Sequence, residues 1–207
     1  MLNSLAITAI TNILLASEVL FLAGKLVCKN PIKEKASFYW SLAFFTVGIS
    51  ALIGGIDHGF FEPFGNSFPR LLIQKATWLS INGIAYFVVM TVSKQFIDKK
   101  FHRVIFFVAI AQFVLIGIVA VLSSKFIIIL INYAIPMLIM LVLSFISWLK
   151  YRRLGRMTIG LVLAFAAAII QVSRTTVFLP VDHNGIYHIV MMIAVICLYK
   201  GAYELYN

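Results

Sequence analysis

Long apolar stretches alternate along the chain with short polar segments. A bilayer core of about 30 Å requires about 20 apolar residues at a rise of 1.5 Å per residue. Stretches of this length are expected at residues 4–27, 37–60, 71–93, 103–123, 126–149, 156–178 and 183–203. The segments between them carry Pro, Gly, Asn and charged residues, as in "KNPIKEK" and "PVDHNG". The pattern predicts an all-α polytopic membrane protein, a bundle of seven transmembrane helices in a single domain, 1–207.

Composition and charge agree with this prediction. Of 207 residues, 62% are hydrophobic and 12% are charged, whereas soluble domains are about 45–50% apolar and about 25% charged. The net charge of +10 comes from cations at the ends of the apolar stretches. This position favours membrane lipids over nucleic acid as the partner. We expect a multi-pass protein of the cell (inner or plasma) membrane, and the sequence leaves its oligomeric state open.

The distribution of basic residues predicts the orientation of the bundle. Thirteen of the 17 Lys and Arg residues fall on one side of the expected spans. The other four lie on or toward the opposite side, and they are Arg70, Lys75, Lys125 and Arg174. Because cytoplasmic loops carry the excess of basic residues, we expect the N-terminus outside and the C-terminus in the cytoplasm.

Ionisable residues gather near the outer end of the expected bundle. A charge inside a span costs about 2.5–3.5 kcal/mol on insertion scales and usually marks function. The gathered residues are Asp57, His58, Lys75, Arg174, Asp182, His183 and His188. These residues converge if the second and seventh helices are neighbours. We expect this arrangement in a bundle whose first and last helices close a ring. Glu18, nearer the middle of the first span, also needs a partner, and the candidates are Asn132, Asn82 and Ser80.

Several of these residues also have a purely structural explanation. Asp182 in "PVDHNGIYH" suits the N-cap of the last helix. Asp57 can form an ion pair with a basic residue of the outer set, Lys75 or Arg174. His188 is harder to explain in this way, because it lies more than one turn inside the last helix and needs a partner there. Three glycines, Gly54, Gly55 and Gly59, lie near the end of the second span. Because they have no side chain, a neighbouring helix or a substrate can come close at this point.

A histidine at the outer end of the second span and histidines opening the seventh resemble the CREST superfamily. That group includes alkaline ceramidases, progestin/adiponectin-type receptors and GPI-lipid remodelling proteins. The resemblance implies a zinc-dependent lipid amidase or esterase whose metal is held by one histidine of the second helix and two of the seventh. By position, His58 matches the second-helix ligand and His188 matches the later ligand of the seventh helix.

The sequence departs from the family pattern at several positions. Gly54 replaces a serine, Lys75 is the charged residue of the third span in place of an aspartate, and Asn184 stands four residues before His188. His183 and His188 are five residues apart, which is about 140° around a helix. Both can face one metal only if the helix begins after His183.

Two classes of function follow from these residues. In the first, zinc is held by a set drawn from His58, His188, His183 and Asp182, and its bound hydroxide attacks a lipid amide or ester in the outer half of the bilayer. Arg174 or Lys75 would stabilise the oxyanion, and Asp57 would be a third ligand or orient a neighbour. In the second, a receptor, small-solute transporter or membrane-organising subunit has a polar pocket without metal.

Overall fold

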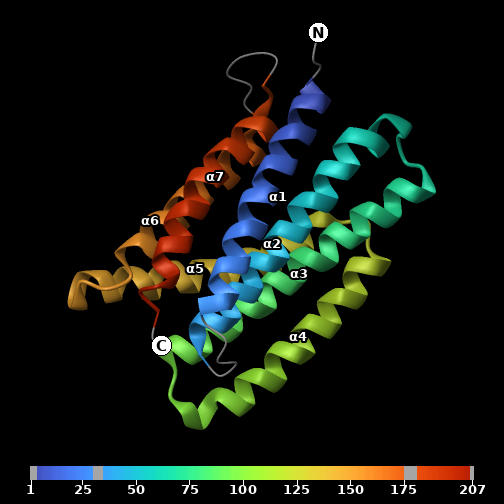
Figure 1. The fold of residues 1–207 in the computed structure, drawn as a ribbon. Coiled ribbons are helices and arrows are strands. Elements are labelled where there is room, and N and C mark those ends of the chain that lie inside the picture. Colours follow the sequence, from blue (N-terminus) through green and yellow to red (C-terminus); the bar gives the residue numbers. More distant parts are fainter. Residues whose placement is uncertain (1–3, 30–34, 175–180, 206–207) are drawn as a thin grey trace.

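The computed structural model describes residues 4–29, 35–174 and 181–205, and long helices dominate it (Figure 1). The long helices are α1 (Ser4–Lys29), α2 (Ala36–Ile56), α3 (Phe68–Phe96), α4 (His102–Leu122), α5 (Phe126–Tyr151), α6 (Gly155–Ser173) and α7 (His183–Ala202). Short helical segments are η1 (Asp57–Phe61), η2 (Glu62–Phe64) and η3 (Lys99–Phe101). In the described part of the chain, seven helices are long and apolar enough to cross a membrane. The all-helical, seven-span prediction is confirmed at this level, and it is compatible with a multi-pass integral membrane protein.

The ends of two helices differ from the expected bounds. The second span runs from Ala36 to Phe64, past the expected end at residue 60. Its α-helix ends at Ile56 and gives way to a π-helical turn at η1, where the Glu62 N–H donates to the Asp57 carbonyl. α6 ends at Ser173, and Arg174 follows in the left-handed region with φ of 52°. Residues 175–178, the expected end of the sixth span, lie outside the described residues.

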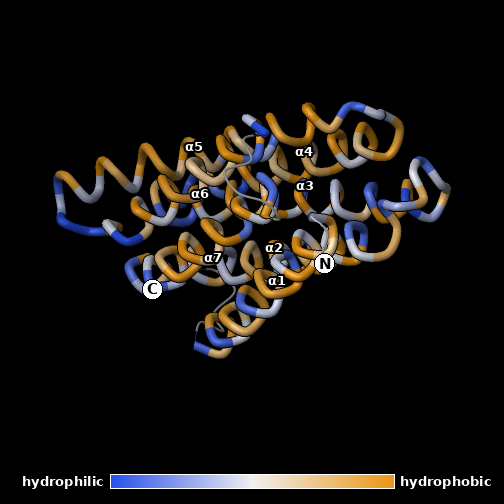
Figure 2. Tube along the Cα trace, turned by 90° about the horizontal axis from the view of Figure 1, so that it is seen from above, coloured by the Kyte–Doolittle hydropathy of each residue, from blue (hydrophilic) through white to orange (hydrophobic). Residues whose placement is uncertain are grey.

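Six helices form a ring, and α4 lies outside it. Going round the ring, each helix packs on the next in the order α1, α2, α3, α5, α6, α7 and back to α1. α4 packs mainly on α3 and has a smaller contact with α5, so it stands at the edge of the bundle (Figure 2). Ala109 and Ala120 are its buried residues, and most of its apolar surface is open.

α1 separates α2 from α7 (Figure 1). It packs along both helices, whereas α2 and α7 touch each other only briefly. The expectation that the second and seventh helices are neighbours therefore holds only for this small contact. The glycines of α2 explain the position of α1, since a Cβ at Gly54 would lie 3.3 Å from Asn12 Nδ2 and one at Gly55 would lie 3.0 Å from the Ile13 side chain. The low bulk predicted at this point serves the approach of α1.

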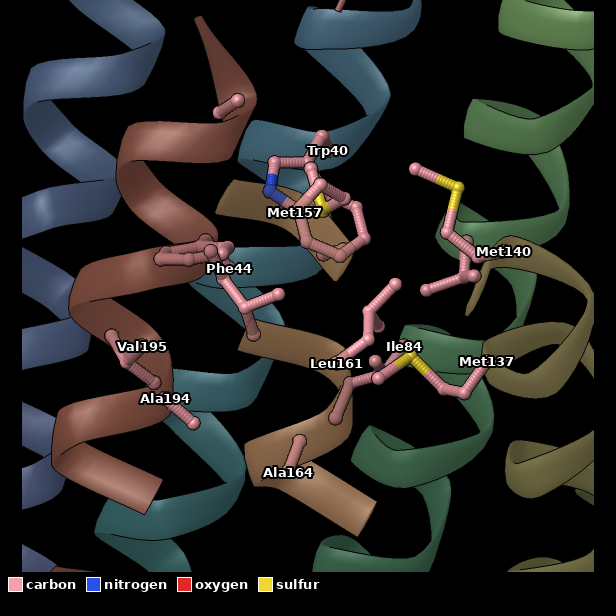
Figure 3. Packing of buried hydrophobic residues seen from close by; sticks show 14 of the residues in the cluster. Trp40, Phe44, Ile84, Met137, Met140, Met157, Leu161, Ala164, Ala194 and Val195 are labelled. Atoms are coloured by element: carbon pink, nitrogen blue, oxygen red, sulfur yellow. The ribbon is translucent and has the colours of Figure 1, made fainter. Parts of the chain in front are cut away.

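The two ends of the bundle differ in how they are filled. We call the end where α1 and α7 begin the N-terminal end, and the end where they finish the C-terminal end. The half toward the C-terminal end is closed by interlocking apolar side chains (Figure 3), among them Trp40, Phe44, Met140, Met157 and Leu161. The apolar side chains therefore pack against one another in the half that is expected to lie toward the cytoplasm.

A close contact between α6 and α7 rests on Gly201. A Cβ at this position would lie 2.5 Å from the backbone N of Met157, which cannot move without shifting α6. We expect Gly201→Ala to lower the free energy of unfolding by about 1–3 kcal/mol, the usual range for overpacking, measured by thermal unfolding in detergent. Gly24→Ala is the matched control, because a Cβ at Gly24 meets no atom within 4 Å. Equal melting temperatures for the two variants would contradict the close contact.

Candidate functional site

A cavity of about 570 Å³ lies inside the helix ring, in the half toward the N-terminal end. Its volume falls in the range of about 300–1,000 Å³ found for small-molecule sites. All six helices of the ring contribute to its wall, and the peripheral α4 does not. The polar side chains of the wall are Asn12, Ser50, His58, Thr77, Tyr133, Gln171, Arg174, His183, Asn184, Tyr187 and His188.

His188 is buried in this wall and is held by α1. Its exposed fraction is 4%, and its Nδ1 lies 3.0 Å from the Thr11 hydroxyl oxygen. Because a hydroxyl can donate or accept, Thr11 can hold the ring whichever nitrogen is protonated. Nε2 makes no hydrogen bond to a described residue, so it is the ring atom left for a ligand in the cavity.

Asp182 is the N-cap of α7, as the sequence predicts. Its Oδ1 accepts a hydrogen bond of 2.9 Å from the Gly185 N–H and another of 2.9 Å from the Thr8 hydroxyl. The two contacts join the start of α7 to α1, and they place the Asp182 carboxylate outside the cavity wall. α7 begins at His183 itself, yet His183 and His188 both reach the cavity.

The π-helical turn η1 carries a compact charge network. His58 Nδ1 contacts the Glu62 carboxylate, while Arg70 lies 3.5 Å from a carboxylate oxygen of Asp57 and 3.5 Å from one of Glu62. The predicted pairing of Asp57 with Lys75 or Arg174 is therefore wrong. The start of α3 packs beside η1. This contact places Arg70, and not Lys75 or Arg174, next to the buried Asp57.

Lys75 and Arg174, the two cations expected to stabilise an oxyanion, occupy different surroundings. Lys75 Nζ donates to the carbonyls of Ala120, at 2.8 Å, and of Ser123. It thus caps the carboxyl end of α4, where a cation is favoured, and it is not part of the cavity wall. Arg174 does line the cavity.

The arrangement of possible zinc ligands can be tested against the geometry. His58, His183 and His188 share one cavity. Within residues 4–29, 35–174 and 181–205, however, no three His, Cys, Asp or Glu side chains form a group that could hold a metal ion. Asp182, the remaining candidate, caps α7 instead. The zinc site therefore stays a prediction from the sequence.

Glu18 does not make the contacts expected for it. It has no hydrogen-bond partner among the described residues, because its candidate partners bond elsewhere: Ser80 to the Ala76 carbonyl, and the two asparagines in a buried amide chain. Gln112 Nε2 donates to Asn132 Oδ1 at 2.6 Å, and Asn132 Nδ2 donates to Asn82 Oδ1 at 3.1 Å. This chain joins α3, α4 and α5, across the ring from α1.

Sequence reasoning missed the residues that position the candidate ligands. Thr8 and Thr11 stand one turn apart on α1, at the level where α7 begins, and they hold Asp182 and His188. The threonine spacing was a usable signal. Arg70 was identified only as an outer basic residue, because its partner depends on how the chain turns after α2.

The sequence matches the family described as "Family of unknown function (DUF6962)" over residues 7–207. The chain therefore belongs to this family. No match to a curated protein or to a solved structure is found. The family description assigns no activity, so the function must be argued from the cavity itself.

The contact between Thr11 and His188 can be tested by removing one hydroxyl. We expect Thr11→Val to lower the free energy of unfolding by about 1–2 kcal/mol, because His188 Nδ1 would stay buried without a partner. Thr91→Val is the matched control, since Thr91 is fully buried and its hydroxyl bonds only the Phe87 carbonyl of its own helix. Thermal unfolding of both variants decides the matter, and a larger loss for Thr91→Val would refute the assigned role of Thr11.

Proposed function

We propose that this chain is a multi-pass membrane protein that binds an amphipathic molecule in the cavity of its helix ring. In this proposal the N-terminal end of the bundle lies at the outer face of the membrane and the C-terminus lies in the cytoplasm. The observation that carries the proposal is the gradient of polarity along the cavity. His58, Arg174, His183 and Asn184 line its outer part, whereas Leu15, Val47, Ile84 and Met191 line its deepest part.

The cavity is closed toward the C-terminal end. At Val47, Ile84, Tyr133 and Met191 it meets a smaller apolar void of about 30 Å³, which is room for about one or two water molecules. Trp40 and Phe44, which belong to the apolar core (Figure 3), line this void. A closed, mainly apolar base supports a binding pocket with a polar mouth, and it suits an alkyl chain with a polar headgroup.

The rim of the cavity supports access from the lipid phase. Phe126, Ile127 and Val172 belong to the wall, and their exposed fractions are 40%, 54% and 67%. They stand at the start of α5 and the end of α6, two helices that pack on each other far less than α6 packs on α7. An amphiphile dissolved in the outer leaflet can therefore enter from the side between α5 and α6.

A lipid amide or ester hydrolase, as the CREST resemblance implies, is the second candidate. The observation in its favour is that His58, His183, His188 and Arg174 meet at one cavity. Metal analysis of the purified protein separates the candidates. Zinc in a one-to-one ratio that is lost in His58→Ala would favour the hydrolase, and its absence from protein that still binds amphiphile would favour the binding protein.

Filling the cavity tests the proposed function directly. Ala168 lines the cavity from α6, and Ala166 lies on the exposed face of the same helix. We expect a photoreactive alkyl alcohol or fatty acid bearing a diazirine to label cavity residues of the wild-type protein. Labelling should fall about ten-fold or more in Ala168→Phe, where the ring takes up the space of the ligand, and should persist in Ala166→Phe.

Mass spectrometry of the cross-linked peptides provides the measurement. Melting temperatures of both variants show that each is folded. Equal labelling of the wild-type protein and Ala168→Phe by every amphiphile would mean that the cavity is not the binding site.

A further inference from the structure

The ionisable side chains of the cavity wall are basic, apart from its tyrosines. Apart from two tyrosines they are one arginine and three histidines, and no Asp or Glu belongs to the described wall. The nearby carboxylates are engaged with other groups. Asp57 and Glu62 face Arg70, Glu62 also contacts His58 Nδ1, and Asp182 caps α7. The wall therefore offers the positive charge of Arg174 and imidazole nitrogens, while the carboxylates near it lie outside the wall.

Arg174 is the permanent charge in this wall. It is the C-cap residue of α6, and its left-handed backbone ends the helix at the mouth of the cavity. Its guanidinium forms no ion pair with a residue in the described ranges. Of the other three outer cations, Arg70 pairs with Asp57 and Lys75 caps α4. The third, Lys125, lies outside the cavity wall. A guanidinium fork without a partner matches the two oxygens of a carboxylate or phosphate.

We propose that the cavity selects amphiphiles with an anionic headgroup, a carboxylate or a phosphate, and that Arg174 is the main headgroup ligand. The proposal rests on the proposed function and adds the class of ligand to it. His183 and Asn184, in the first turn of α7, and the Nε2 side of His188 supply further polar contacts around the same headgroup. The alkyl chain lies along the apolar base formed by Leu15, Val47, Ile84, Leu130 and Met191.

The test compares photoreactive amphiphiles of equal chain length that differ only in the headgroup. The probes are a fatty acid, an alkyl phosphate and the uncharged alcohol, each bearing a diazirine, with the protein in nanodiscs of neutral lipid. We expect the two anionic probes to label cavity residues about ten-fold more strongly than the alcohol, in line with a charge-assisted contact. Arg174→Gln should abolish this preference, and Arg174→Lys should restore part of it.

Lys125→Gln is the matched control, because it removes a positive charge at the start of α5, at the same end of the bundle, from a residue outside the cavity wall. It should keep the full preference for anions. A loss of preference equal to that of Arg174→Gln would show that surface charge alone attracts the anions, and it would overturn the assignment of Arg174. The melting temperature of each variant confirms that it is folded.

The remaining outcomes separate the two proposals. Equal labelling of the cavity by the acid and the alcohol would overturn anion selection and leave the proposed binding function standing. Labelling of the cavity by none of the probes would contradict the proposed function itself. Inorganic phosphate or acetate that competes as well as the amphiphiles would identify a small anion as the ligand, and would overturn the role assigned to the alkyl chain.

Discussion

Polar groups surrounded by apolar helices must find partners inside the bundle, and this constraint sets where the helices lie. Unpaired polar groups in hydrocarbon cost several kcal/mol each. Thr8 and Thr11 satisfy Asp182 and His188, and so fasten the start of α7 to α1. The glycines at the end of α2 let α1 come close enough to separate α2 from α7. On the opposite side, the amide chain of Asn82, Asn132 and Gln112 joins α3, α4 and α5.

The candidate site consists of the polar groups that this pairing leaves over. Lys75 and Gln112 hold α4 against the outside of the ring, so the six remaining helices can enclose a cavity. Arg70 takes up the charge of Asp57. The Arg174 guanidinium and the Nε2 of His188 are left on the cavity wall, without a hydrogen bond to any residue in the described ranges. These two groups are the ones that a ligand in the cavity would contact.

The sequence was sufficient for the spans, for the N-cap at Asp182 and for the gathering of ionisable residues near one end. It was insufficient for the neighbours of each helix, because an apolar face looks the same whether it meets lipid or another helix. This is why the position of α1 between α2 and α7 could not be predicted. The partner of Asp57 was missed for a related reason: the π-helical turn after Ile56 alters the direction of the side chains that follow, and no residue preference signals it. The sequence suggested Asn82 and Asn132 as partners of Glu18, but these two asparagines lie across the ring and form a hydrogen bond with each other.

The central proposal is that the ring encloses a cavity that is open to water and lipid at the N-terminal end, which is proposed to face outward, and is closed toward the C-terminal end. Thiol accessibility tests it most directly, after Cys28 and Cys197 have been replaced by serine. Ser50 lines the cavity and Val88 is fully buried in the C-terminal half. A membrane-impermeant maleimide added to intact cells should modify Ser50→Cys and leave Val88→Cys unmodified, and a fatty acid should slow the first reaction. Equal protection of both cysteines from external reagent would contradict the account.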